Sequence, residues 1–182
     1  MKKIIIVIIS CTIFFSLVCA ITIYTSIRNL GAIKIENSTQ TSLKIVGKVE
    51  LKKSAITEKA DVIGKVKVFN STLNNIKTIG FLNLHDNSKV NGDIKVTGNL
   101  FMSLSRIEKQ LNITSENIEI NDNSYVRSIF VNKDEDNKEE VISIDNSIVD
   151  GNIEFESQHG KVKLKNGAKV TGTVIGGTVD TI

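Results

Sequence analysis

The amino-acid sequence predicts an all-β fold, a parallel β-solenoid of about seven turns, preceded by one transmembrane α-helix. Three observations support this prediction. A short phrase recurs at a fixed spacing, apolar and polar residues alternate between its copies, and the first part of the chain is apolar and uncharged. Repeats at a fixed period are typical of coils in which each turn stacks on the one before it.

The N-terminal segment, residues 1–27, is expected to be a single-pass membrane anchor or a signal peptide. Lys2 and Lys3 begin it, Arg28 follows it, and no charged residue lies between them. This apolar run is longer than the roughly 20 residues that span a bilayer. Residues 18–20 resemble a signal-peptidase site, but the run stays apolar beyond them, which favours an uncleaved anchor. The flanking charges favour a body outside the cytoplasm.

Two further regions follow the anchor. Residues 28–42 are interpreted as a linker, because one short alternating patch there gives way to a polar run. Residues 43–182 are expected to form the solenoid domain. Their hydrophobic period is two, as in Val66-Lys67-Val68 and Ile142-Ser143-Ile144, which indicates short strands with one buried face.

The repeated phrase is a small residue, a spacer, and then Ile, Leu or Val. Its first four copies begin with serines 17 residues apart, and later copies return at longer intervals. The copies are Ser54-Ala55-Ile56, Ser71-Thr72-Leu73, Ser88-Lys89-Val90, Ser105-Arg106-Ile107, Ser124-Tyr125-Val126, Ser147-Ile148-Val149 and Ala168-Lys169-Val170. The apolar pairs that precede them are Val49/Leu51, Val66/Val68, Leu82/Leu84, Leu100/Met102, Ile118/Ile120, Ile142/Ile144 and Val162/Leu164. This period divides into about three segments per turn, which predicts a three-sided coil with the phrase at one corner.

A polar excursion at residues 133–140 accounts for part of the lengthening of the repeat. In a solenoid such an insertion leaves the coil at a corner without disturbing the core. Its acidic residues could form a calcium loop or a solvated loop. A calcium loop needs a glycine at its turn, and none is present, so we expect a solvated loop.

The closing stretch, residues 164–174, resembles the recurring unit of the bactofilins, polymer-forming bacterial cytoskeletal proteins. It reads Leu164-Lys165-Asn166-Gly167-Ala168-Lys169-Val170-Thr171-Gly172-Thr173-Val174, which fits apolar-x-x-Gly-Ala-x-Val-x-Gly-x-apolar. Residues 88–96 and 147–155 follow the same plan. The resemblance covers about residues 43–182 and implies a right-handed parallel β-helix that polymerises end to end. The N-terminal membrane segment is an addition to the usual bactofilin pattern.

No catalytic, cofactor-binding or metal-binding motif emerges from the sequence, so we expect neither an enzyme nor a cofactor. Glycan-cleaving β-helices need converging carboxylates, often beside Arg, Lys or His. Glu154 and Glu156 flank Phe155 on one outward face, and nothing pairs them with Glu119 or Glu139, which lie elsewhere. Both cysteines lie in the N-terminal segment, so the domain has no disulfide and no thiolate metal site.

Histidines and lysines are interpreted as surface residues. His85 and His159 each lie in a polar corner, about four turns apart. The 23 Lys and Arg nearly balance the 20 Asp and Glu. Lysines alternate with apolar residues, as Lys65 and Lys67 do around Val66, which is typical of solvated strands. A nucleic-acid partner, which would need a basic patch, is therefore not expected.

The C-terminal stretch, residues 174–182, points to self-association. It stays apolar and strand-like, with no charged helix to cap the open end that a solenoid leaves. We therefore expect a homo-oligomer or polymer, a membrane-anchored and self-associating β-helical scaffold of the bacterial cell envelope. The alternative is a secreted or surface-exposed β-helix that binds or cleaves polysaccharide. A binding rod would need an exposed aromatic or apolar stripe. The aromatic residues available for one are Phe69, Phe81, Phe101, Tyr125, Phe130 and Phe155, and several of them are expected to face inward.

Overall fold

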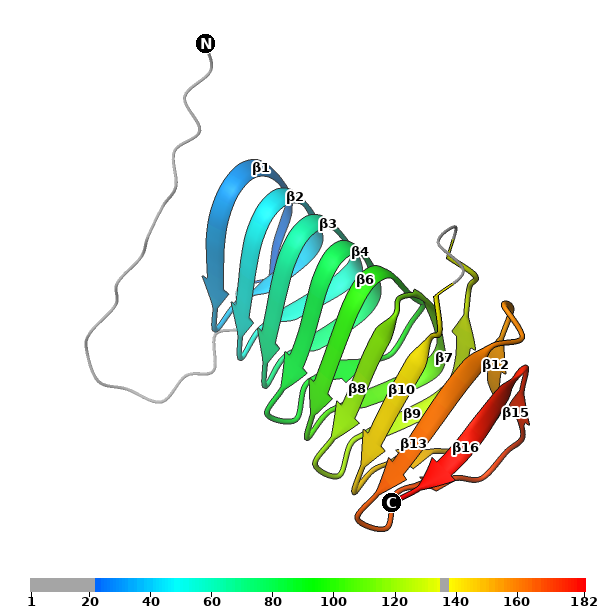
Figure 1. Ribbon diagram of the computed structural model, residues 1–182. Coiled ribbons are helices and arrows are strands. Elements are labelled where there is room, and N and C mark those ends of the chain that lie inside the picture. The colour runs from blue at the N-terminus through cyan, green and yellow to red at the C-terminus, as the bar shows by residue number, and fades with distance from the viewer. Residues whose placement is uncertain (1–21, 135–137) are drawn as a thin grey trace.

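The chain winds into a parallel β-solenoid of about nine turns, in which each turn stacks on the previous one (Figure 1). This computed structural model describes residues 22–134 and 138–182. All strands join one continuous 16-stranded sheet, and every pairing is parallel. The strands are β1 (Thr22–Glu36), β2 (Thr39–Lys52), β3 (Ala55–Phe69), β4 (Thr72–His85), β5 (Lys89–Val90), β6 (Ile94–Ser103), β7 (Arg106–Thr114), β8 (Asn117–Asn121), β9 (Tyr125–Val131), β10 (Val141–Asp145), β11 (Ile148–Val149), β12 (Ile153–Phe155), β13 (Gly160–Lys165), β14 (Lys169–Val170), β15 (Val174–Ile175) and β16 (Gly177–Thr181).

The prediction of a transmembrane α-helix is wrong where the structure describes that segment. Residues 22–27 belong to strand β1, which pairs in register with β2, so that Ile27 lies beside Leu43. No described residue is helical, and none of the described elements could span a bilayer as a helix. Hydropathy reports only that the run containing residues 22–27 is apolar and does not distinguish a helix from a strand. Here the backbone N–H and C=O groups find hydrogen-bond partners in the neighbouring turn, whereas an isolated apolar segment would find them within its own helix. The rest of the expected anchor, residues 1–21, lies outside the described residues.

The coil also begins earlier in the chain than expected. Residues 28–42, interpreted as a linker, hold the end of β1 and the start of β2. Counting from Thr22 gives about nine turns instead of the predicted seven. The three-sided coil is confirmed, most clearly where the last two turns each contain three separate strands: β11, β12 and β13, then β14, β15 and β16.

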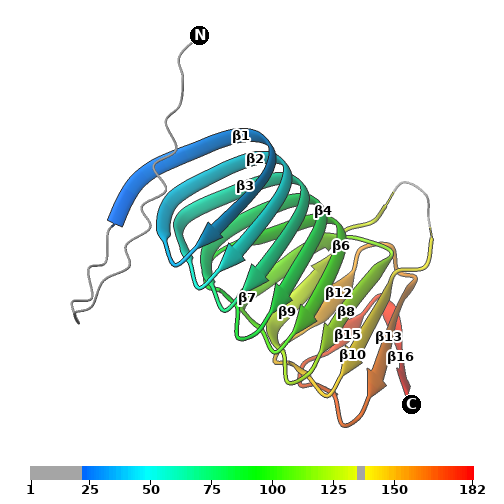
Figure 2. The same cartoon turned by 90° about the vertical axis from the view of Figure 1, so that its left-hand side faces the viewer.

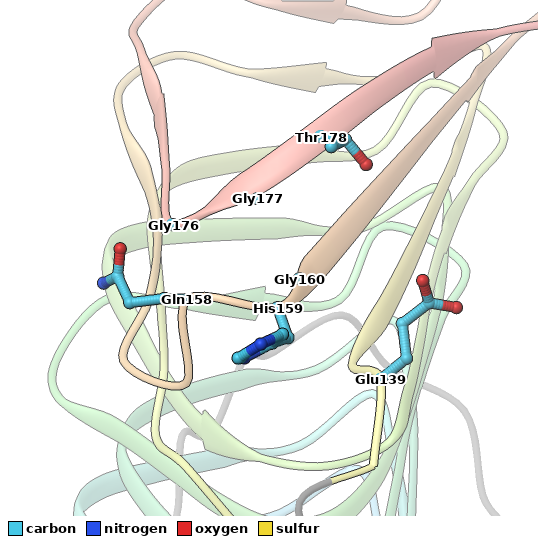
Figure 3. Close-up of a pocket in the computed structure, with 7 residues that line it drawn as sticks. All are labelled: Glu139, Gln158, His159, Gly160, Gly176, Gly177 and Thr178. Atoms are coloured by element: carbon cyan, nitrogen blue, oxygen red, sulfur yellow. The ribbon is translucent and has the colours of Figure 1, made fainter.

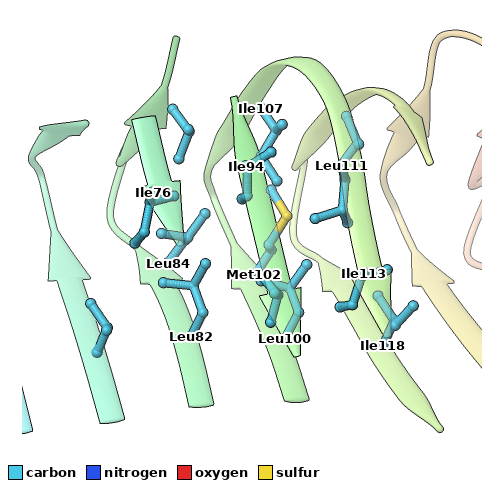
Figure 4. Packing of buried hydrophobic residues seen from close by; sticks show 14 of the residues in the cluster. Ile76, Leu82, Leu84, Ile94, Leu100, Met102, Ile107, Leu111, Ile113 and Ile118 are labelled. Atoms are coloured by element: carbon cyan, nitrogen blue, oxygen red, sulfur yellow. The ribbon is translucent and has the colours of Figure 1, made fainter. Parts of the chain in front are cut away.

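The repeated phrase forms one continuous stack, as predicted. Its spacer residues are partners in successive turns from Ala55 through Lys169, and its aliphatic residues follow beside them. The apolar pairs form two further columns that face the interior, and of these only Leu164, near the open end, is not fully buried. Figure 4 shows such side chains packed between neighbouring turns. The alternation of apolar and polar residues therefore builds a continuous core, because the inward side chains of each turn are covered by those of the next turn.

The serines of the phrase are buried at one corner and hold neighbouring turns together. Ser54 N donates to Ser71 Oγ at 2.9 Å, and Ser124 N donates to Ser147 Oγ at 3.1 Å. Each hydroxyl also donates back within its own turn, as Ser71 Oγ does to Phe69 O at 2.7 Å. A small side chain with both a donor and an acceptor satisfies these buried backbone groups. The last copy has Ala168 at this position, so the chain of hydroxyls ends there.

A column of glycines marks a second corner, which the strands cross without interruption. Gly47, Gly64 and Gly80 are partners in successive turns, with Gly31 before them and Gly98 after them. All five have φ between 118° and 140°. A Cβ on Gly64 would lie 1.9 Å from the carbonyl oxygen of Gly47, so the corner needs glycine for both conformation and space. Figure 2 shows the long strands β1 to β4 bending from one side of the coil to the next.

Candidate functional site

The final turn, residues 168–182, leaves one edge of the coil open. Within the described residues, its strands β14, β15 and β16 pair only with the turn before, through β11, β12 and β13. Val179 continues the inward column of Val162, but Val162 is 0% exposed whereas Val179 is 46% exposed. Strand edges and apolar columns of this kind normally meet another turn, a cap or a partner.

The first turn, β1, has an open edge of the same type. Within the described residues β1 pairs only with β2. The inward column that ends at Val179 begins at Ile33, which is partly buried against the core. A neighbouring column begins at Ile35 and ends at Thr181. The two ends of the coil thus present the same columns in the same order.

Charge is distributed unevenly along the coil. Residues 28–103 carry 12 Lys and Arg against 6 Asp and Glu, whereas residues 104–182 carry 9 against 14. The small net charge of +3 therefore hides a basic first half and an acidic second half. Such an arrangement favours contact between unlike ends of two copies and disfavours contact between like ends.

An open pocket lies beside the last turns, and Figure 3 shows His159 between Gln158 and Glu139 at this place. Glycines form part of its wall because the Phe155 ring lies directly behind them: a Cβ on Gly160 would be 2.1 Å from that ring. His159 Nδ1 lies 2.7 Å from Ser157 O. The pocket has a single carboxylate, from Glu139, whereas the usual cleavage of glycans employs two. Its lining is Glu139, Gln158, His159, Gly160, Gly176, Gly177 and Thr178.

The other carboxylates considered from the sequence occupy separate places. Glu119 lies exposed in β8, and Glu154 lies exposed in β12. Glu156 Oε2 accepts a hydrogen bond from Lys133 N at 2.9 Å. Within the described part of the chain, no group of three or more Asp, Glu, His or Cys side chains could hold a metal ion.

The polar excursion leaves the coil between β9 and β10, where a corner insertion was predicted. The strands on both sides keep their register, since Val131 pairs with Phe155 and Val141 with Lys161. Lys138 Nζ lies 2.6 Å from Glu116 Oε1 and ties the excursion to the preceding turn. The core is therefore undisturbed, while residues 135–137 lie outside the described residues.

His85 is half-buried within a row of rings on the outside of the coil. Its ring stacks on Phe69 at 5.1 Å between centroids and lies 5.2 Å from Phe101. Burial lowers the pKa of His85 below its ordinary value, and the nearby Lys67 acts in the same direction. His159, by contrast, is exposed, so the surface interpretation fits it better than it fits His85.

Aromatic side chains face outward more often than expected. Of the six considered from the sequence, Phe155 alone is buried, and the expectation that several face inward is wrong. The outward rings occupy spacer positions between inward aliphatic residues, as Phe69 does beside Val68, because the period of two places neighbours on opposite faces. Tyr125 lies beneath the guanidinium of Arg106, which is 3.7 Å from the ring centroid.

Sequence reasoning missed an exposed apolar row beside the glycine column. Leu30, Val46, Ile63 and Ile79 each precede one of the glycines and are exposed. The signal was present as an aliphatic-Gly pair that returns after 16 or 17 residues.

Two surfaces of the molecule therefore stand out, the open C-terminal end and the apolar row along the glycine corner. Comparison with known proteins found no matching protein-family model, no matching curated protein and no matching solved structure. The function is accordingly inferred from the geometry of these surfaces.

Proposed function

We propose that this protein is a self-associating β-helical scaffold whose copies stack end to end, as the resemblance to the bactofilins implies. The supporting observation is the open last turn, where the inward residue Val179 is 46% exposed. A second copy docked on this edge would pair the strands and cover the column. Complete burial of a valine contributes about 1.5–3 kcal/mol, so covering the exposed half of Val179 contributes about 1 kcal/mol.

The two ends of the coil differ, so such stacking joins the C-terminal end of one copy to the N-terminal end of the next. A contact between unlike surfaces that does not close into a ring produces a filament. The columns support this arrangement because Ile33 begins the column that Val179 ends. The basic first half and acidic second half of the chain add a favourable charge arrangement.

Sedimentation of the full chain tests this proposal. All proteins are compared in the same detergent solution. The wild-type protein should form species larger than a monomer, in proportions that rise with protein concentration. Val179→Lys should require at least about tenfold more protein for the same assembly, because a charge would be buried in the contact. Thr178→Lys is the matched control, since Thr178 lies next to Val179 but is the partner of the outward Lys161.

A strict monomer at high concentration would contradict end-to-end stacking, and so would equal assembly by Val179→Lys and wild type. Circular dichroism of both variants should retain the β signal, because both positions are exposed on the final strand. Any effect of residues 1–21 is common to all three proteins and cancels in the comparison.

A further inference from the structure

An exposed row of aliphatic side chains runs along the glycine corner of the first four turns. We call Leu30, Val46, Ile63 and Ile79 the aliphatic ridge; they are partners in successive turns and are 80%, 45%, 52% and 43% exposed. Turns stack about 4.8 Å apart, so the ridge extends about 15 Å along the coil. A continuous apolar row of this kind on a soluble surface marks an interaction site.

The backbone prevents these side chains from turning inward. Val46, Ile63 and Ile79 each follow a buried residue, as Ile63 follows Val62, and neighbours on a strand face opposite sides. The glycine after each of these three packs against the glycine of the preceding turn: a Cβ on Gly80 would lie 2.2 Å from Gly64 O. At this corner, where the strands in Figure 2 bend, the aliphatic side chains are therefore exposed on a tightly packed backbone.

Lysines flank the ridge on both sides. Lys44 and Lys77 lie two residues before ridge residues, and Lys95 is the partner of Lys77 in the next turn. Lys48 and Lys65 lie two residues after ridge residues, and all five lysines are exposed. None of these five lysines forms an ion pair with a described residue.

The same flanking positions hold one carboxylate, Asp61, and it pairs with Lys59 at 2.9 Å. A shallow hollow beside the ridge is lined by four lysines and one carboxylate: Lys34, Lys48, Lys65 and Lys67 with Glu50. Lysines therefore outnumber carboxylates around the ridge.

We propose that the aliphatic ridge and its flanking lysines form a contact surface for an anionic lipid bilayer. Apolar side chains enter the boundary between headgroups and acyl chains, while lysines meet the lipid phosphates. The segment before β1, residues 4–21, is apolar and uncharged in sequence, and it enters the coil at the turn that carries Leu30. This interaction goes beyond the proposed scaffold and uses a side of the coil, not its ends.

A second copy of the chain is a poorer occupant of the ridge. Two ridges packed together would bring the lysine rows of one copy against those of the other. Like charges opposed across an interface disfavour association. An anionic bilayer instead complements both the apolar row and the cationic rows beside it.

A single tryptophan on the ridge tests the proposal in the full chain. The protein has no Trp, so Ile63→Trp creates a reporter at this position alone. With vesicles of equal parts phosphatidylcholine and phosphatidylglycerol, its emission should shift to the blue and be quenched by brominated lipid. Ile148→Trp is the matched control, since Ile148 is 44% exposed on another side of the coil, and its emission should not change.

Charge reversal checks the contribution of the lysines. Adding Lys48→Glu and Lys65→Glu to Ile63→Trp should weaken the vesicle-induced shift at least about tenfold in lipid concentration. Vesicles of phosphatidylcholine alone should give little shift. Each tryptophan reports lipid contact at its own position. Vesicle binding through residues 1–21 alone would therefore not produce the expected difference between Ile63→Trp and Ile148→Trp.

Three outcomes would overturn the proposal. The first is an Ile63→Trp emission that ignores anionic vesicles, and the second is an equal response at Ile148→Trp. The third is a blue shift that depends on protein concentration and not on lipid, which would make the ridge a contact between copies. Val179→Lys in the Ile63→Trp background should leave the lipid response intact, so failure of end-to-end stacking is distinguishable from failure of lipid contact.

Discussion

One hydroxyl group in the core lacks a partner. Thr78 is 0% exposed, and its Oγ1 forms no hydrogen bond with a described residue. Its partners in the neighbouring turns are Val62 and Val96. Thr78→Val should therefore raise the free energy of unfolding by about 1 kcal/mol, because it removes an unsatisfied polar group and keeps the shape of the side chain. Urea denaturation followed by circular dichroism measures the change.

Thr97→Val is the control for that substitution. Thr97 is exposed on β6, so the same chemical change there should alter stability by less than about 0.5 kcal/mol. Equal effects at both positions, or a loss of stability in Thr78→Val, would show that the Thr78 hydroxyl has a partner in solution.

His85 gives the molecule a dependence on pH. Burial among Phe69 and Phe101 lowers the pKa of His85 below its ordinary value of 6.5, so the unfolded state binds the proton more readily. Stability should therefore fall as the pH drops below about 6.5, since the folded state then binds fewer protons than the unfolded state. His85→Phe should lose less stability than wild type between about pH 7.5 and about pH 5.5 in urea melts. Parallel losses in the two proteins would remove His85 as the cause.

At the level of single residues, the sequence predicts inward positions well where the strands are regular and poorly at the glycine corner. The inward column that contains Val66 and Leu82 follows from alternation alone. Thr78 is harder to predict from residue type, because Ile79 beside it is the more apolar residue and is the natural candidate for the core. Thr78 is nevertheless buried with Ile76 and Leu82, which lie an even number of residues away, and Ile79 is exposed.

Among the structural elements, the glycine column is the one most sensitive to substitution. Gly31 and Gly64 both have positive φ, but a Cβ on Gly31 meets nothing within 4 Å, whereas a Cβ on Gly64 lies 1.9 Å from Gly47 O. Gly31→Ala should thus lose about 1–2 kcal/mol from backbone strain alone. Gly64→Ala should lose more than about 3 kcal/mol, because the turns must also separate. Thermal unfolding of the pair separates the two causes, and equal losses would contradict the steric one.

The strands were predictable as elements, and their extent was not. Apolar alternation and the serine phrase identify the sides of the coil, because both reflect which residues face a neighbouring turn. Alternation does not show where one side passes into the next, and β3 passes through Gly64 as a single element. The extent of β1 is hidden for a different reason: its apolar residues also fit a membrane segment, and only its pairing with β2 distinguishes the two.

For the whole molecule, the uneven charge predicts how assembly responds to salt. In the proposed head-to-tail stack, the basic half of one copy would approach the acidic half of the next, and this attraction would be screened as ionic strength rises. Light scattering of the full chain without lipid should therefore report weaker or slower assembly as NaCl increases from about 20 mM to about 500 mM. Stronger assembly in high salt would indicate a contact driven by apolar burial alone.

The shared columns of the coil also make its turns interchangeable. Residues 54–70 form one complete turn, and removing them would join Lys53 to Ser71 with every remaining column intact. Removing one residue from within a side, away from the register shifts that absorb a residue near the corners, would instead exchange inside and outside along the rest of that side. The molecule can therefore be shortened or lengthened only in whole units of about 4.8 Å. Duplication of such a unit within a gene would lengthen the rod by one turn. The number of repeats therefore sets the length of the rod.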